Sequence, residues 1–483
     1  MVTYKTPNVY VEEISTFPPS VAEVSTAIPA FIGYTEKTGI DDELKNNPTR
    51  INSLLDYETL FGKAEASEFS VTESAGVIAP ISPPTLKYLM YYALRIYFDN
   101  GGGSCYIVSV GDYNGTKQKD HFLAGLSALE KEDEPTLIML TDAANLGATD
   151  YYELCKQALM QCNRLKDRFA IFDVLKEKTD ETGTGADETG TEATEGKATG
   201  GVDGFRQGIG TNDLKYGAAY HPYLQTSLNY YYTDESVTIK GGGETTEAAE
   251  NTETGETTEA GETADSNLSK IKTKNTDLYN KIKTELAKQR VVLPPSAAVA
   301  GVYARVDRDR GVWKAPANVS LASVLAPTEK ITNEEQENLN VDPTAGKSIN
   351  AIRSFTGKGT LIWGARTLAG NDNEWRYIPV RRLFNLIEES IQKATAFVVF
   401  ESNNTITWLK VKSLIESYLE GLWRQGALAG ATPEQAFFVH IGLGQTMTAQ
   451  DILEGRMIVE IGLAAVRPAE FIILKFSHKL QEA

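Results

Sequence analysis

Short apolar runs alternate with longer stretches of helical periodicity between residues 28 and 174. The runs are five or six residues long and rich in Ile, Val and Phe, which favours β-strands. They predict strands at 30–34, 105–110, 136–140 and 169–174. The stretches between them predict helices at 86–98, 121–130 and 150–165. This alternation is typical of an α/β layer.

The pattern changes after residue 346, where two amphipathic helices precede a group of strands. Each helix repeats apolar residues three and four positions apart, and Gly426 ends the second one. The apolar positions are Leu383, Leu386, Ile387 and Ile391 in the first helix, and Leu414, Ile415, Tyr418, Leu419 and Leu422 in the second. Strands are predicted at 437–443, 457–466 and 471–476. An α+β domain fits this order.

Two segments of very different composition lie in the middle of the chain. Residues 177–204 and 241–265 consist almost entirely of Glu, Asp, Thr, Gly and Ala, with recurrent ETG and TTEA fragments. Such segments bury too little apolar surface to offset the entropy of ordering them, so we expect solvated loops. They flank a Tyr-rich piece at 216–232, which we predict to form a small insert. A mixed-charge helix is predicted at 267–289.

Two further strand patterns lie near the two ends of the sequence. Residues 8–14 read NVYVEEI and residues 470–478 read EFIILKFSH. An apolar strand without a partner invites aggregation, so both must pair with something. They pair either with each other or their own sheet, or with the sheets of neighbouring subunits. The residues concerned are Val9, Tyr10, Val11, Ile14, Phe471, Ile472, Ile473, Leu474 and Phe476.

Composition and charge exclude several classes of protein. The formal net charge is −18, with 47 basic and 65 acidic residues, which is opposite to a nucleic-acid-binding surface. No run approaches the roughly 20 apolar residues of a membrane span, and no export signal is expected. The three cysteines have no CxxC spacing and the four histidines are scattered, so neither a disulfide framework nor a metal site is expected.

Enzyme motifs are incomplete. A P-loop ends in GKS, as residues 346–348 do, but Val341 stands where its first glycine is needed. Gly101, Gly102 and Gly103 follow a predicted helix and precede a strand, which is the reverse of a nucleotide-binding loop. The sequence therefore predicts no catalytic, cofactor-binding or metal-binding residues.

A compact charged string lies beside Trp313. Arg305, Arg308 and Arg310 alternate with Asp307 and Asp309. Either these residues form a salt-bridged, solvated helix, or they form a contact between subunits, since Arg and Trp are favoured at interfaces.

Several strings resemble the contractile-tail sheath proteins of phages, pyocins and phage-like injection systems. The opening YKTPNVYVEEI and AFIGYTEK are similar to the start of that family, and the last 135 or so residues are closer still. The strings there are INAIRSFTGKGTLIWGARTL, WRYIPVRRL, IEESI, VFESN and PAEFI, with weaker likeness in YFDNGGGSCYIVSV and GVYARVDRDRGVWKAPAN. The Thr/Glu-rich segments match no family pattern.

The resemblance implies a multidomain protein of α/β and α+β class with an inner and an outer layer. The inner α+β domain combines an N-terminal arm, 1–27, with a C-terminal region, 346–483. The outer α/β domain comprises 28–176 and 291–345, with the acidic insertion at 177–290. In that family the two arms are exchanged with adjacent subunits, which selects the second interpretation of the terminal strands.

The implied function is a structural subunit, not an enzyme, that polymerises helically around an inner tube and contracts. The implied partners are other sheath subunits, possibly paralogous, the tube, baseplate and terminal cap proteins, without nucleic acid or membrane insertion. We expect assembly in the bacterial cytoplasm and a place in a phage or phage-like particle. Candidate tube-facing residues are Arg381, Arg382, Lys393, Lys410, Lys412 and Arg424, each of which equally fits a solvated helix face.

Two alternatives remain at this stage. One is a Rossmann-like enzyme built on residues 28–174, with the C-terminal region as a dimerisation domain; it requires a glycine loop that is not seen. The other is a secreted adhesin or surface-array protein with decorated Thr/Glu-rich loops, which requires an export signal.

Overall fold

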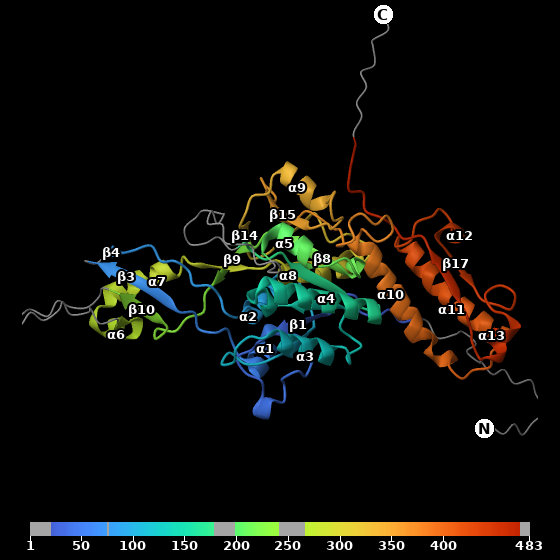
Figure 1. Cartoon of the computed structure of the whole chain (residues 1–483), viewed down its shortest axis with the longest axis horizontal. Coiled ribbons are helices and arrows are strands. Elements are labelled where there is room, and N and C mark those ends of the chain that lie inside the picture. Colours follow the sequence, from blue (N-terminus) through green and yellow to red (C-terminus); the bar gives the residue numbers. More distant parts are fainter. Residues whose placement is uncertain (1–20, 75–76, 178–198, 241–265, 474–483) are drawn as a thin grey trace, which may run out of the picture. The chain divides into compact units, whose positions relative to one another are not determined.

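The computed structural model describes residues 21–74, 77–177, 199–240 and 266–473, and these form two compact units (Figure 1). The larger unit lies within Ser25–Asn385 and also includes residues from Arg467 onward. The smaller unit combines residues 21–24 with Leu386–Val466. The predicted strand at 8–14, with Val9, Tyr10, Val11 and Ile14, lies outside the described residues.

A nine-stranded sheet forms the centre of the larger unit, in the order β13-β16-β15-β8-β7-β6-β1-β5-β2. The six strands from β15 to β5 run parallel, and β13, β16 and β2 are antiparallel to their neighbours. The bounds are β1 Pro29–Gly33, β2 Thr49–Ile51, β5 Cys105–Ser109, β6 Leu137–Leu140, β7 Phe169–Asp173, β8 Gly217–His221, β13 Val319–Ser320, β15 Asn350–Phe355 and β16 Gly359–Ile362.

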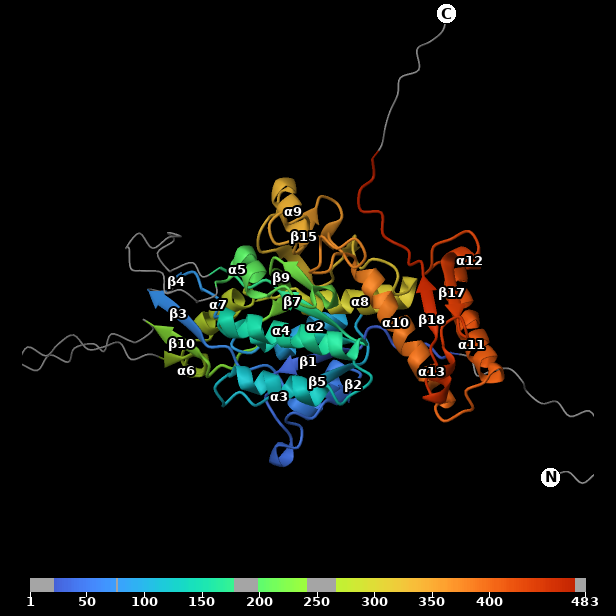
Figure 2. The same ribbon diagram turned by 45° about the vertical axis from the view of Figure 1, so that its right-hand side comes forward.

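Helices cover both faces of this sheet (Figures 1 and 2). On one face α2 (Met90–Asp99) packs with α8 (Ser296–Arg310), and on the other α3 (Lys119–Leu129) packs with α4 (Ala148–Leu165). Alternate residues of β1 point to opposite faces, so Phe31 joins one buried cluster and Ala30 and Ile32 join the other. Strands buried on both faces are apolar throughout, which is why the sequence shows them as continuous runs.

The four strands predicted between residues 28 and 174 are confirmed as β1, β5, β6 and β7, and the three helices as α2, α3 and α4. The small insert predicted at 216–232 is wrong, because β8 is an internal strand of the main sheet between β7 and β15. Its small residues Gly217, Ala218 and Ala219 are buried, and the acidic composition of the flanking segments obscured that strand.

A side module extends from the main sheet in both views (Figures 1 and 2). Its four-stranded sheet has the order β11-β10-β3-β4, and the apolar side chains of β3 and β10 pack against two short helices. The bounds are β3 Phe69–Ser74, β4 Val77–Ile78, β10 Val237–Lys240, β11 Ser266–Asn267, α6 Leu268–Lys274 and α7 Thr276–Leu286. The helix predicted at 267–289 is thus two helices, because the Asn275 side chain accepts the Leu278 amide and starts α7 anew.

The remaining elements of the larger unit connect these parts. A three-stranded sheet has the order β12-β9-β14. Along the chain β9 and β12 connect the main sheet with the side module, and β14 lies between β13 and β15. The bounds are η1 Ile40–Asp42, α1 Leu54–Phe61, η2 Asp142–Asn145, α5 Gly201–Gly208, η3 Leu214–Tyr216, β9 Leu224–Asn229, β12 Arg290–Leu293, β14 Val324–Pro327 and α9 Asn333–Asn340. The predicted domain boundary at residue 346 differs from the boundary between the two units. Strands β15 and β16 belong to the main sheet, and the smaller unit resumes at Leu386.

Two long helices and a two-stranded sheet make up the smaller unit. The predicted apolar faces of both helices are buried, as is Ser390. Helix α10 begins in the larger unit and ends in the smaller one. The bounds are α10 Ile378–Thr395, η4 Ala396–Val398, α11 Thr405–Arg424, α12 Pro433–Ala436, β17 Phe437–His440, α13 Ala449–Leu453 and β18 Glu460–Leu463.

Two buried aspartates occupy the carboxyl ends of adjacent parallel strands. Asp142 follows β6 and accepts the backbone amides of Tyr34, at 2.7 Å, and of Leu89, at the start of α2. Asp173 ends β7 and accepts the amide and hydroxyl of Ser296, at 2.8 and 2.6 Å, at the start of α8. Burial raises the pKa of Asp142 to about 6 and that of Asp173 to about 7, against the effect of these hydrogen bonds.

We predict that Asp173→Asn changes the pH dependence of folding. A carboxyl whose folded pKa is raised stabilises the fold fully below its usual value of 3.8, and this contribution is lost as pH rises through about 7. The amide variant lacks that loss, so its melting temperature relative to wild type should rise between about pH 4 and pH 8. Exposed Asp309→Asn serves as the control, and a difference from wild type that is constant with pH would contradict the prediction.

Candidate assembly interface

An ion pair between the buried Arg366 and the partly exposed Glu470 fixes the chain just before the predicted C-terminal strand. Both carboxylate oxygens of Glu470 accept from the guanidinium of Arg366, at 2.9 Å from Nε to Oε1 and 2.6 Å from Nη2 to Oε2. The Asn340 side chain and the Tyr377 hydroxyl also donate to this carboxylate, at 2.7 and 3.1 Å. Only 4% of the Arg366 side chain is exposed. We call these four residues the C-terminal anchor.

The electrostatics of this anchor favour the charged carboxylate. Burial acts to raise the pKa of Glu470, but the hydrogen bonds from Arg366 and Asn340 outweigh it and leave the pKa below its usual value. The pair is therefore intact at neutral pH, and it weakens only in acid, as pH falls through that lowered pKa.

The three large apolar residues that follow the anchor are exposed to solvent. Phe471, Ile472 and Ile473 are 70%, 78% and 79% exposed, and they form no strand in the described chain. Leu474 and Phe476, the other residues of the predicted strand, lie outside the described residues. Contiguous exposed apolar side chains are a common feature of interaction surfaces.

A second ion pair fixes the chain near residue 25. The Arg382 guanidinium of α10 donates to both carboxylate oxygens of Asp307 in α8, at 3.0 and 2.5 Å. Arg382 also donates to the Thr26 carbonyl, at 2.8 Å, and the Thr26 hydroxyl donates to Asp307, at 2.7 Å. The arginine lies 4.7 Å from the centre of the Tyr303 ring. We call Thr26, Asp307 and Arg382 the N-terminal anchor.

The charged residues beside Trp313 differ in their environments. Asp307 is internal, whereas Arg308 and Asp309 are exposed and paired with each other at 3.3 Å. Arg305 donates to the Ser320 carbonyl at 2.7 Å. One residue of the string is therefore structural, and its neighbours form a largely solvated helix end.

The six candidate tube-facing residues do not share one environment. Arg381 and Arg382 are 2% and 4% exposed, so they lie in the interior and not on a helix surface. Arg381 stacks 4.4 Å from the Trp375 ring and donates to Asn385 at 2.8 Å. The two adjacent arginines near the start of α10 suggested an exposed side, but this part of the helix is buried all round. Neither residue is retained as a tube-facing candidate.

The other four candidates lie at the surface. Lys393 pairs with Glu389, Lys412 with Glu416 and Arg424 with Glu420, each partner one helical turn away. Lys410 is exposed and forms no ion pair with any described residue. On α11 it adjoins Ile406 and Leu409, which are 66% and 61% exposed.

The sheet of the smaller unit has open edges in the described chain. It consists of β17 and β18 alone, paired antiparallel from Phe437 opposite Leu463 to His440 opposite Glu460. Phe438, in the middle of β17, is 44% exposed. The outer edges of a two-stranded ribbon offer unpaired backbone groups to a further strand.

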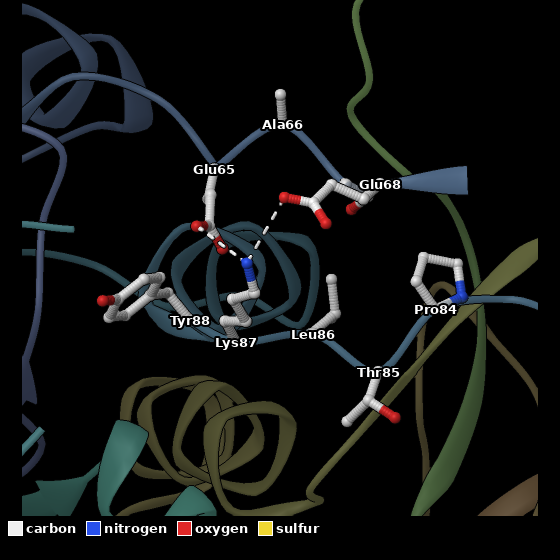
Figure 3. A pocket seen from close by; sticks show the side chains of 9 residues that line it. Glu65, Ala66, Glu68, Pro84, Thr85, Leu86, Lys87 and Tyr88 are labelled. Atoms are coloured by element: carbon white, nitrogen blue, oxygen red, sulfur yellow. Dashed lines mark ion pairs between the residues drawn. The ribbon is translucent and has the colours of Figure 1, made fainter. Parts of the chain in front are cut away.

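Sites for chemistry are not evident in the described residues. A cavity of about 120 Å³ is lined by residues that include Glu65, Glu68 and Lys87, and the lysine lies between the two carboxylates at 3.9 and 3.5 Å (Figure 3). Ligand sites usually enclose roughly 300 Å³ or more. The helix N-termini that would bind phosphate at the strand ends already hold Asp142 and Asp173.

The same part of the chain contains no cluster of three His, Cys, Asp or Glu side chains suited to a metal ion. Lys347, in the GKS string, is buried and donates to the Arg206 carbonyl. Cys105, Cys155 and Cys162 are buried, free thiols, and burial raises the pKa of each. The enzyme alternative is not supported. No described helix has the length and apolar character needed to cross a bilayer.

Known proteins resemble this chain over its whole length. The phage tail sheath protein central domain matches residues 237–368, and the phage tail sheath C-terminal domain matches residues 370–479. The PVC sheath complex of an extracellular contractile injection system, solved in the contracted state, is 30% identical over 99% of both chains, with a TM-score of 0.63. The contracted helical sheath of the anti-feeding prophage is 31% identical over 99% of this chain and 100% of that one, with a TM-score of 0.62.

This chain belongs to the contractile tail sheath family. Among curated relatives, the tail sheath protein of Enterobacteria phage T4 is 27% identical over 129 residues, which are 27% of this chain and 19% of that protein. A prophage major tail sheath protein of Pseudomonas aeruginosa is 25% identical over 37% of this chain and 44% of its own length. The match to these curated sheath proteins thus spans less than half of their length.

The anchors of this sheath-family chain were missed in the sequence, although their residues stand in the strings that carried the resemblance. Arg366 lies in LIWGARTL, Glu470 in PAEFI, Arg382 in WRYIPVRRL and Asp307 in GVYARVDRDRG. The available signal was a charged residue set among apolar ones. A single sequence does not show which charges meet.

We predict that Glu470→Gln loosens the C-terminal anchor of the sheath-family chain without unfolding it. The amide cannot accept both guanidinium bonds, which leaves a buried arginine partly unpaired at a local cost of roughly 2 kcal/mol. Denaturant unfolding should give a free energy of unfolding that is lower than that of wild type by about this amount. The control Glu460→Gln changes an exposed residue of β18, and equal stability of the two variants would contradict the prediction.

We predict a larger effect at the N-terminal anchor. Asp307→Asn leaves the buried Arg382 charge uncompensated and should cost about 3–5 kcal/mol of folding free energy. Asp309→Asn, two residues away on the exposed side of α8, should change stability by less than about 0.5 kcal/mol. Denaturant unfolding of the two variants provides the comparison, and matched stabilities would refute a structural role for the anchor.

Proposed function

We propose that this chain is the sheath subunit of a contractile tail or injection device. Subunits polymerise helically around an inner tube, and contraction drives the tube through a target envelope. The observation that carries the proposal is the exposed apolar run Phe471–Ile473, which directly follows the rigid Arg366–Glu470 pair. Because Glu470 is held by an ion pair and the next three apolar side chains are exposed, this segment is suited to pairing as a strand with another subunit.

The acceptor in this proposal is the open ribbon of β17 and β18. A strand from a neighbouring subunit would hydrogen bond to the free edge of β17 or β18 and cover Phe438. Residues 8–14, with Val9, Tyr10, Val11 and Ile14, supply the second strand in the same way. Residues 1–27 and the C-terminal region then form the inner layer, and the α/β part with its acidic insertions forms the outer layer.

Contraction follows from repacking of subunits that remain linked by these strands. Contacts that do not close on themselves generate helical arrays. An extended array held behind a kinetic barrier releases free energy when it repacks. Even about 1 kcal/mol per subunit sums over a long array to far more than one two-state switch provides. The anchors keep each strand attached to its own subunit during the change.

The tube contact is assigned to the exposed side of α11. Lys410, without an ion pair in the described chain, and its neighbours Ile406 and Leu409 offer charge and apolar area together. Lys393, Lys412 and Arg424 remain further candidates. The partners are other sheath subunits, possibly paralogous, and tube, baseplate and cap proteins. Assembly occurs in the bacterial cytoplasm, and the product is part of a phage or phage-like particle.

Negative-stain electron microscopy of the expressed protein tests the proposal. Wild type, expressed with the genes beside its own, should form long hollow cylinders. Deletion of residues 474–483 should leave small particles, because the exchanged strand is shortened. Deletion of residues 178–198, an acidic segment outside the proposed strand, is the control and should still give cylinders. Small particles from the wild type under every condition would overturn the proposal.

A further inference from the structure

Four exposed lysines on α6 and α7 give the side module a basic surface. Lys270, Lys272, Lys274 and Lys281 are exposed, and none of them forms an ion pair with a described residue. We call these four residues together the lysine face. Lys270 and Lys274 are one turn apart and share a side of α6, whereas Lys272 is two positions from each and points to another side of that helix. By contrast, Lys283 and Lys288 of the same region are paired with Asp234 and Glu285, at 3.1 and 2.6 Å. Residues 266–290 contain seven basic and two acidic residues, in a chain of formal charge −18.

An acidic segment is joined to this module at both ends. Residues 241–265 follow β10 and precede β11, and these two strands pair antiparallel, with Ile239 opposite Ser266. The segment has an acidic residue at every third position and no basic residue. The positions are Glu244, Glu247, Glu250, Glu253, Glu256, Glu259, Glu262 and Asp265.

We propose that the lysine face is a docking surface for an acidic polypeptide and that its occupant is the segment 241–265 of the same chain. The charges are complementary, and α6 begins at Leu268, three residues after the segment ends. Tethering at both ends makes the effective concentration of the segment about millimolar, which favours it over the same segment of another copy.

The regular spacing explains how such a contact forms without a fixed register. Any three consecutive residues from Glu244 onward include one carboxylate, so every part of the segment that reaches the face presents charge. Lysine is suited to a contact without fixed register, because its ammonium group binds as a point charge, whereas the planar guanidinium of arginine favours a defined geometry. The other acidic segment, 178–198, has irregular spacing and contains Lys178 and Lys197. A free polyanion is disfavoured by the net negative charge of the chain.

The proposal does not depend on the sheath function and is tested on the free subunit. The eight acidic residues of 241–265 are changed to the corresponding amides, and acylation of individual lysines by a small amine-reactive ester is followed by mass spectrometry. Acylation of the lysine face should accelerate about two- to fivefold, as expected for the loss of one exposed ion pair per lysine. At about 1 M salt, where charges are screened within roughly 3 Å, wild type should match the variant.

Two controls isolate the effect. Lys410 is exposed on α11 and unpaired in the described chain, and its acylation should not change. Amide substitution of the acidic residues in 178–198 should leave the lysine face unaffected. Equal acylation of the face in wild type and the 241–265 variant at low salt would overturn the proposal.

Zero-length carbodiimide cross-linking identifies the occupant. In an equal mixture of light and nitrogen-15-labelled subunits, cross-links between the lysine face and 241–265 should join only chains of the same label. Mixed-label links in statistical proportion would show that a second copy is the occupant and refute the intrachain assignment. Heparin binding by wild type as tight as by the 241–265 variant would show that the face is open, which also contradicts the proposal.

Discussion

Arg382 and Arg366 are buried in the larger unit, and each pairs with a carboxylate, that of Asp307 in the interior and that of the partly exposed Glu470. These two pairs fix the backbone near the terminal segments. A bidentate arginine–carboxylate contact is directional as well as strong, and loss of either partner leaves a buried charge. At the C-terminal side the pair holds Glu470, and the three apolar residues that follow it are exposed.

The main sheet supplies the rigid frame that these pairs need. Its parallel strands are buried on both faces, and the strand ends at which α/β enzymes bind ligands are occupied by Asp142 and Asp173. Each carboxylate takes the hydrogen-bonding groups at a helix start that a phosphate would otherwise use. The main sheet thus shares the parallel, helix-covered topology of α/β enzymes, but buried carboxylates occupy the ends of β6 and β7.

Periodicity predicted the local structure well and the long-range pairings poorly. The strands at residues 30–34 and 169–174 were visible because burial on both faces makes them wholly apolar. Strand β8 was missed because Gly217, Ala218 and Ala219 carry little hydrophobic signal and lie beside acidic segments. Arg382 was predicted to lie at the surface, but it is buried against Asp307 and Thr26. These partners are 75 and 356 positions away in the sequence, so the local pattern did not indicate the contact. No single-sequence pattern encodes such separations.

Cryo-electron microscopy of an assembled cylinder tests the central claim most directly, because it shows which chain completes the ribbon of β17 and β18. The account predicts that the Arg366–Glu470 pair is retained and that the chain after Glu470 hydrogen bonds with the ribbon of a neighbouring subunit. A density map in which residues 471–476 return to the sheet of their own subunit would contradict it.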